Sequence, residues 1–262
     1  MIIDFHTHIF PDHIASGAIS HLEKEGGVKA HLDGTRGDLL ASMNKNGIDS
    51  SVVCSIATKP SQFQSILDWS LTLKSDRLVP FASIHPDDPN CLEQIRQIKK
   101  LGFKGIKMHP YYQDFFITDK RLHPIFSLLS DLQLIVLMHT GYDIAFPRIR
   151  RADPKMIREI HTLFPDLLLV TSHLGAWEQW EEVQEMLVGK PIYMDISFSL
   201  KSLSREKARD ILCNHPSDYI LFGSDSPWEG QGISLRMLED LELDDKLLNK
   251  IKGENAKQLL RG

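Results

Sequence analysis

Eight short runs rich in Val, Ile, Leu and Phe recur along the chain, and each run predicts a β-strand. Most of them are continuously apolar, which is typical of parallel strands that are buried on both faces. The runs span residues 2–9, 51–57, 78–85, 103–109, 132–140, 167–174, 192–198 and 219–224.

Between most of these runs the apolar residues take a helical spacing and form one stripe per segment. Four such stripes lie in residues 39–48, 92–101, 122–129 and 156–163. Asp153-Pro154 and Ser204 precede helical stretches as start signals. Gly47 and Gly102 follow helical stretches and are predicted as C-caps.

The alternation of strand and helix predicts an α/β protein whose parallel sheet is connected by right-handed crossovers. Eight units fit a closed (β/α)₈ TIM barrel better than an open sheet, which more often has about five or six strands. The 262 residues also match a single barrel of about 250 residues. No linker or low-complexity tract interrupts them, so we expect one domain over residues 1–262, with a long insertion at residues 10–38.

Composition narrows the class of protein further. A hydrophobic share of 42% and a charged share of 25% are those of a globular chain. The net charge of −5 and the scattered basic residues give no nucleic-acid footprint. No apolar run reaches the roughly 20 residues of a membrane span, and no signal peptide is recognisable. The three cysteines are an odd number without close spacing, so neither disulfides nor a cysteine-based zinc site is indicated, and we expect a reducing, cytoplasmic location. The expected partner is a small-molecule substrate.

Histidines stand at the carboxyl ends of the predicted strands, where barrels of this type carry their chemistry. His6 and His8 end the first strand. Because side chains alternate along a strand, these two should share one side while Phe5 and Thr7 take the other. Two imidazoles on one strand face can bind a single divalent ion.

Four further strand ends carry polar residues of the same kind. These residues are Lys107 and His109 after the fourth strand, His139 after the fifth, His173 after the sixth and Asp225 after the eighth. A lone histidine at a strand end usually supports a loop. Five such ends at one rim are different, because each buried polar group costs about 1–3 kcal/mol when it is unpaired. We therefore predict a divalent-metal site.

These motifs resemble the amidohydrolase superfamily. Its amidohydrolase-related branch, which includes aminocarboxymuconate-semialdehyde decarboxylases, is similar in the segments at residues 105–110, 172–175, 222–228 and 255–256. The resemblance spans residues 3–260. It implies a TIM barrel of the metallo-dependent hydrolase type, and it says little about the substrate.

The resemblance also implies roles for the strand-end residues. In single-metal relatives the ion is held at the positions of His6, His8, His139 and Asp225. His173 is then a catalytic acid or base, or else a ligand of a second ion. Lys107 is a bridging carbamate in a two-metal site or a lysine that binds the substrate carboxylate. We expect one ion, zinc, with manganese or another divalent metal as alternatives.

Substrate contacts are expected from His109 and Lys107, from Trp228, which can wall an apolar pocket, and from Arg150. Arg150 belongs to a group with Arg148 and Arg151 in the loop after the fifth strand. This group either grips a carboxylate or forms a solvated basic loop.

The expected activity is metal-dependent hydrolysis of a small amide, ester or lactone. Asp225 acts as the general base toward a metal-activated water, and His173 polarises the carbonyl. The alternative is non-oxidative decarboxylation of a small unsaturated or aromatic acid, with a proton from His173 or the metal-bound water and an arginine on the carboxylate. A metal-binding protein without turnover is less consistent with an open rim. The resemblance implies a homodimer.

Overall fold

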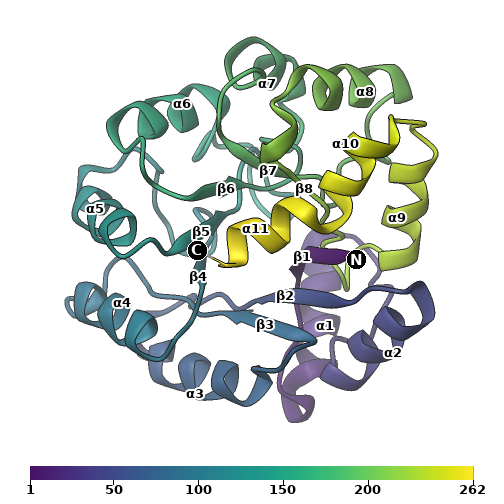
Figure 1. Ribbon diagram of the computed structural model, residues 1–262. Coiled ribbons are helices and arrows are strands. Elements are labelled where there is room, and N and C mark those ends of the chain that lie inside the picture. Colours follow the sequence, from purple (N-terminus) through teal and green to yellow (C-terminus); the bar gives the residue numbers. More distant parts are fainter. Residues whose placement is uncertain (262) are drawn as a thin grey trace.

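Eight parallel strands form a ring that helices surround in the computed structural model, which describes residues 1–261 (Figure 1). Each strand overlaps one of the eight apolar runs, so the predicted strands are confirmed. Their bounds are β1 Ile3–Thr7, β2 Ser50–Cys54, β3 Leu78–Phe81, β4 Gly105–Met108, β5 Ile135–Met138, β6 Leu169–Thr171, β7 Tyr193–Asp195 and β8 Ile220–Leu221.

The ring is closed by pairing at two seams. Strands β1 to β3 form one hydrogen-bonded set and β4 to β8 another. At one seam Lys107 N–H donates to Ala82 O at 2.8 Å, and at the other Phe5 N–H donates to Phe222 O at 2.8 Å. All neighbouring strands run parallel. The predicted (β/α)₈ barrel is therefore confirmed.

The helices follow the strands and cover the outside of the ring. They are α1 Asp12–Gly26, α2 Arg36–Asn46, α3 Phe63–Leu73, α4 Cys91–Lys100, α5 His123–Asp131, α6 Pro154–Leu163, α7 Trp180–Met186, α8 Arg205–Asn214, α9 Gln231–Glu239, α10 Asp245–Asn249 and α11 Asn255–Arg261. Short 3₁₀ turns lie at Pro60–Gln62, Lys120–Leu122 and Ser217–Tyr219, and a π-helical turn lies at Lys250–Glu254.

Three of the four predicted helix ends are confirmed. The fourth differs by one residue, because the C-cap of α4 is Leu101 and Gly102, with a φ of 74°, follows it. Asp153 caps α6 by accepting from Met156 N–H, and Ser204 caps α8 by accepting from Lys207 N–H. Gly47 adopts a φ of 66° after α2, a conformation that costs a glycine little. Within residues 1–261 no helix combines the length and apolar character that a bilayer crossing would require.

The insertion at residues 10–38 contains a helix, α1, that the sequence analysis did not assign. Ile14, Ala15, Ala18, Ile19 and Leu22 have the spacing of a helical stripe. Ala15 and Ile19 are buried beneath α1, whereas Ile14 is 46% exposed. An insertion that folds as a helix adds a wall beside the barrel mouth.

Apolar side chains fill the inside of the ring from the end where the strands begin. This inner cluster unites residues from β1, β2, β3, β5, β6 and β8 with Ala256 and Leu259 of α11. Helix α11 crosses the centre of the ring in Figure 1 and closes that end. The polar rim residues therefore lie at the opposite end, where the strands finish.

Strict alternation fails at one point in β1. Phe5 belongs to the inner cluster and packs edge-on against Phe81 at 5.8 Å between ring centroids. The prediction had placed Phe5 on the side away from His6. The pairing of β1 with β2 shifts register between Asp4 and Thr7, and such an irregularity breaks the two-residue period.

Buried His215 is the basis for an expected sensitivity of the folded protein to acid. Its ring is 4% exposed, its Nε2 donates to Ile192 O at 2.9 Å, and its Nδ1 has no partner within the described residues. Burial lowers the pKa of His215 from 6.5 to about 4, although the bond to Ile192 opposes this. A proton on Nδ1 would place an unpaired charge in the interior.

We predict that stability falls between pH 6.5 and pH 4, because the unfolded chain binds a proton there and the folded chain does not. The contribution of His215 is complete above pH 6.5, and up to about 3 kcal/mol of it is lost toward pH 4. His215→Gln should flatten this pH dependence in urea unfolding, whereas His21→Gln on the surface of α1 should not. An unchanged slope in His215→Gln would contradict the assignment.

Candidate metal centre and its cavity

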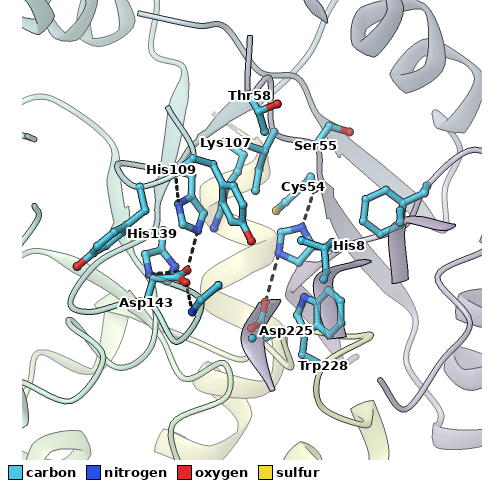
Figure 2. A pocket seen from close by; sticks show the side chains of 18 of the residues that line it. His8, Cys54, Ser55, Thr58, Lys107, His109, His139, Asp143, Asp225 and Trp228 are labelled. Carbon is cyan, nitrogen blue, oxygen red and sulfur yellow. Dashed lines mark hydrogen bonds and ion pairs between the residues drawn. The ribbon is translucent and has the colours of Figure 1, made fainter. Parts of the chain in front are cut away.

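The predicted strand-end residues line one cavity of about 1030 Å³ at the carboxyl ends of the strands (Figure 2). The residues of this set that line the cavity are His6, His8, Lys107, His109, His139, His173, Asp225 and Trp228. Arg150 does not line it. The barrel therefore gathers side chains that lie more than 200 positions apart in the sequence.

Three of these side chains present ligand atoms to a common point. The Nε2 atoms of His6 and His8 lie 3.2 Å apart, and Asp225 Oδ1 is 3.5 Å from the first and 3.2 Å from the second. Figure 2 shows His8 and Asp225 facing each other in the cavity. Two imidazole nitrogens and one carboxylate oxygen are a donor set that zinc or manganese accepts.

The outer nitrogens of both rings are held by acceptors. His8 Nδ1 lies 2.8 Å from Cys54 O, and His6 Nδ1 lies 3.0 Å from Asp195 Oδ2. A carbonyl or an ionised carboxylate oxygen can only accept, so each Nδ1 carries the proton. The Nε2 lone pairs therefore face the common point, as metal-ligating histidines require.

Electrostatics favour the ligand forms of His6 and Asp225. Burial lowers the pKa of His6 well below its ordinary value, and the Lys107 ammonium lowers it further. Burial by itself would raise the pKa of Asp225, but the neighbouring His6 and His8 outweigh it and bring that pKa to about 2. At neutral pH the His6 imidazole is neutral and the Asp225 carboxylate is ionised, and these are the forms that bind metals.

Lys107 lies against the same group of atoms. Its side chain is 1% exposed, and Nζ lies 2.9 Å from His6 Nε2. Burial lowers the pKa of the Lys107 amine, while nearby Cys54, Asp195 and Asp225 oppose that shift. A bridging carbamate and a substrate contact would each require Lys107 to lie beside the candidate metal ligands. Its position is therefore compatible with both predicted roles.

His139 lies apart from the group formed by His6, His8 and Asp225. Its ring stacks on that of His109 at 4.1 Å between centroids, and its Nδ1 lies 3.1 Å from His173 Nε2. Asp143 Oδ2 is 3.3 Å from His109 Nε2 and 3.6 Å from His139 Nε2. Among residues 1–261 these three form a second group whose ligand atoms lie within 4.8 Å of one another.

The contacts of His139 and His173 limit which ring nitrogens can carry hydrogen. His139 Nε2 lies 3.1 Å from Tyr142 O, a carbonyl, so this nitrogen is the donor and His139 Nδ1 is the acceptor. The partner of that acceptor is His173 Nε2, which can supply the hydrogen of this bond. On its other side His173 Nδ1 lies 3.0 Å from Ser197 O and 3.1 Å from Ser197 Oγ. A neutral His173 keeps its hydrogen on Nε2 when the Ser197 hydroxyl donates to Nδ1, whereas the tautomer that donates to Ser197 O leaves Nε2 without hydrogen.

Asp195 and Asp143 are site residues that the sequence analysis missed. Asp195 ends β7 and is fully buried, and its Oδ1 accepts from Ser197 N–H at 2.9 Å. The rule that polar residues at strand ends form the site would have found it. Asp143 lies in the loop four residues after His139, and such a position carries no comparable signal.

The arginines after β5 are engaged elsewhere. Arg150 pairs with Asp153 at 2.8 Å and with Glu182. Arg148 pairs with Glu178, and Arg151 pairs with Asp114 at 2.7 Å. These pairs match the interpretation of a solvated basic loop more closely than that of a carboxylate clamp.

Comparisons with known proteins agree with this architecture. The sequence matches the family model described as Amidohydrolase over residues 3–262. No curated protein matches the sequence.

Among solved structures, an uncharacterised TIM-barrel protein from Bordetella bronchiseptica is similar with a TM-score of 0.82 and 20% identity, covering 99% of this chain and 98% of its own. A manganese-bound dihydroxybenzoic acid decarboxylase from Polaromonas sp. JS666 has a TM-score of 0.70 and 13% identity, with 99% and 96% coverage. A putative 2-pyrone-4,6-dicarboxylic acid hydrolase from Pseudomonas putida has a TM-score of 0.68 and 15% identity, with 99% and 97% coverage. Further similar structures also belong to decarboxylases of aromatic acids.

The bond between Asp195 and His6 generates a prediction about metal affinity. Asp195→Asn replaces the carboxylate by an amide, which holds His6 Nδ1–H less firmly. We expect zinc binding, measured by competition with a chelator, to weaken by about 10–100-fold. Asp210→Asn on the surface of α8 is the matched control and should bind zinc normally. Unaltered zinc affinity in a folded Asp195→Asn variant would show that this bond does not support the site.

Proposed function

Because this chain belongs to the amidohydrolase family, we propose that it is a divalent-metal-dependent enzyme that decarboxylates an aromatic or unsaturated carboxylic acid without an oxidant. The observation that carries the proposal is the contact of 3.1 Å between His173 Nε2 and His139 Nδ1, which can hold a hydrogen on His173 at the wall of a largely apolar cavity. The several decarboxylases among structures of the same fold give independent support.

The reaction needs one proton and releases one molecule of CO₂. The bond between the carboxylate carbon and the ring or alkene carbon breaks, and its electron pair stays on the latter carbon. In this proposal the hydrogen shared between His173 Nε2 and His139 Nδ1 is given by His173 to that carbon, and the imidazole regains a proton from water. His139 accepts from His173, and Tyr142 O fixes the tautomer of His139.

A divalent ion bound by His6, His8 and Asp225 would supply positive charge that holds the substrate carboxylate. Lys107 Nζ lies beside the same atoms and can hold the second carboxylate oxygen. Lys107 thereby takes the role that the sequence analysis had given to an arginine. The apolar walls exclude water, and a carboxylate without hydration loses CO₂ more readily.

The number of ions is part of this proposal. We propose one ion per chain, with Lys107 as a substrate contact. A second ion is the alternative, because His139 Nδ1 and His173 Nε2 face each other at 3.1 Å and a carboxylated Lys107 would lie near both groups.

Hydrolysis is the second candidate, and the geometry of Asp225 favours it. Its carboxylate is ionised at neutral pH and lies 3.2 Å from His8 Nε2, so it can accept a proton from an attacking water. The water oxygen would join the carbonyl carbon, and the leaving group would take the proton. The similar putative hydrolase supports this candidate.

We predict CO₂ release from aromatic monocarboxylates by zinc- or manganese-loaded protein, measured in the headspace. His173→Gln should lower kcat by about 10²–10⁴-fold and keep its metal, since it removes the proton donor and not a ligand. His161→Gln, in the last turn of α6, is the control and should match the unmodified protein. Hydrolysis of esters or lactones without CO₂ release from any acid would replace the proposal by the second candidate.

Lys107→Met gives a separate prediction about the number of ions. If Lys107 contacts the substrate, metal analysis should find about one ion per chain in both proteins, and KM should rise in the variant by about tenfold or more. Methionine keeps the length of the side chain and removes its charge. About two ions in the unmodified protein and about one in Lys107→Met would establish the carbamate instead.

A further inference from the structure

The cavity is much larger than the metal centre at its base. Its volume of about 1030 Å³ lies at the upper end of the range of about 300–1,000 Å³ for small-molecule sites. Beyond the polar base the cavity extends between α1, α3 and the loop after β5, whose contributions include Ile14, Ile66, Trp69 and Phe146. A single benzene ring at the metal centre would leave this outer part to water.

Apolar side chains at the mouth of the cavity are exposed to solvent. Ile14 is 46% exposed on α1, and Ile144 is 48% exposed in the loop after β5. The end of α1 approaches that loop closely, since a Cβ atom at Gly26 would lie 3.3 Å from Ile144 Cδ1. Large apolar side chains gathered around an opening are typical of sites that bind an apolar group.

The positive and negative side chains that line the cavity are distributed unequally between its base and its outer part. Among the described residues that line it, Lys107 is the sole lysine or arginine, and it lies at the base. The acidic lining residues are Glu25, Asp143 and Asp225. The arginines of the nearby loop are paired outside the cavity, as described above. A carboxylate at the base can meet Lys107. The rest of the lining also includes polar side chains such as those of His13, Thr58 and Gln62, and His21, which pairs with Glu25 at 3.3 Å, but a second carboxylate there would meet no lysine or arginine.

We propose that the substrate has one carboxylate and, on the far side of it, an apolar group larger than a single benzene ring, which lies between α1, α3 and the loop after β5. This inference rests on the proposed function for the position of the carboxylate. It deepens that function by excluding dicarboxylates and by assigning the outer cavity to substrate selection. Residues of α1 then set specificity without taking part in the chemistry.

Calorimetric titration of the zinc-loaded protein with three probes tests this inference. The probes are 2-naphthoate, benzoate and 2,6-naphthalenedicarboxylate. We expect 2-naphthoate to bind at least about tenfold more tightly than benzoate, because its second ring buries further apolar area. We expect the dicarboxylate to bind at least about tenfold more weakly than 2-naphthoate, because its second charge loses water without a lysine or arginine to pair with.

A charge introduced at the mouth provides the matched variant. Ile14→Arg should strengthen binding of the dicarboxylate severalfold, because it adds a cation where the second carboxylate lies. Ile149→Arg is the control: Ile149 is 43% exposed in the loop after β5 and does not line the cavity. Binding of the dicarboxylate by Ile149→Arg should equal that of the unmodified protein.

Benzoate or the dicarboxylate binding as tightly as 2-naphthoate would overturn the inference, and so would a failure of all three probes to bind. These titrations do not depend on turnover. Tight binding of 2-naphthoate without CO₂ release from any acid would count against the proposed function alone. CO₂ release from small polar acids without a preference for 2-naphthoate would count against this inference alone.

Discussion

A carboxylate without access to solvent needs donors, and Asp195 has three of them in the site. Its Oδ2 lies 3.0 Å from His6 Nδ1, and its Oδ1 accepts from the backbone N–H groups of Ser197 and His173 at 2.9 and 3.3 Å. One side chain therefore orients a candidate ligand and the turn that carries the candidate acid. The positions of His6 and His173 depend on this one buried charge, because a rotated Asp195 would release both.

The base of the cavity is lined by buried polar side chains, whereas its mouth is lined by exposed apolar ones. At the base, imidazoles, a carboxylate and Lys107 are buried together, and such a group is stable only when its members are paired. At the mouth, apolar side chains are left partly exposed. The barrel strands hold the first set rigidly, whereas α1 and the loops supply the second. The proposed chemistry and the proposed selection of substrate thereby belong to different parts of the fold.

The strands and their ends could be predicted from sequence because continuous apolar runs and the 3.6-residue helical period are local properties of the chain. The prediction for Phe5 was wrong because a register shift depends on the neighbouring strand and leaves no local pattern. Arg150 could not be placed, since its partners Asp153 and Glu182 are set by how the loop folds. The ring orientation of His139 depends on Tyr142 O and His173 in the same way. The sequence pattern therefore predicts which residues lie at the carboxyl ends of the strands, but it does not predict the direction of each side chain.

The seam between β1 and β8 has a consequence for how the protein is made. Ribosomes deliver β1 first and β8 last, so the edge of β1 stays unpaired until Phe222 emerges to accept from Phe5 N–H. His6 and His8 leave the ribosome early, and their partner Asp225 follows more than 200 residues later. A nascent chain therefore offers two of the three candidate ligands, His6 and His8, before Asp225 is made. A metal ion can meet the full donor set only after the ring has closed.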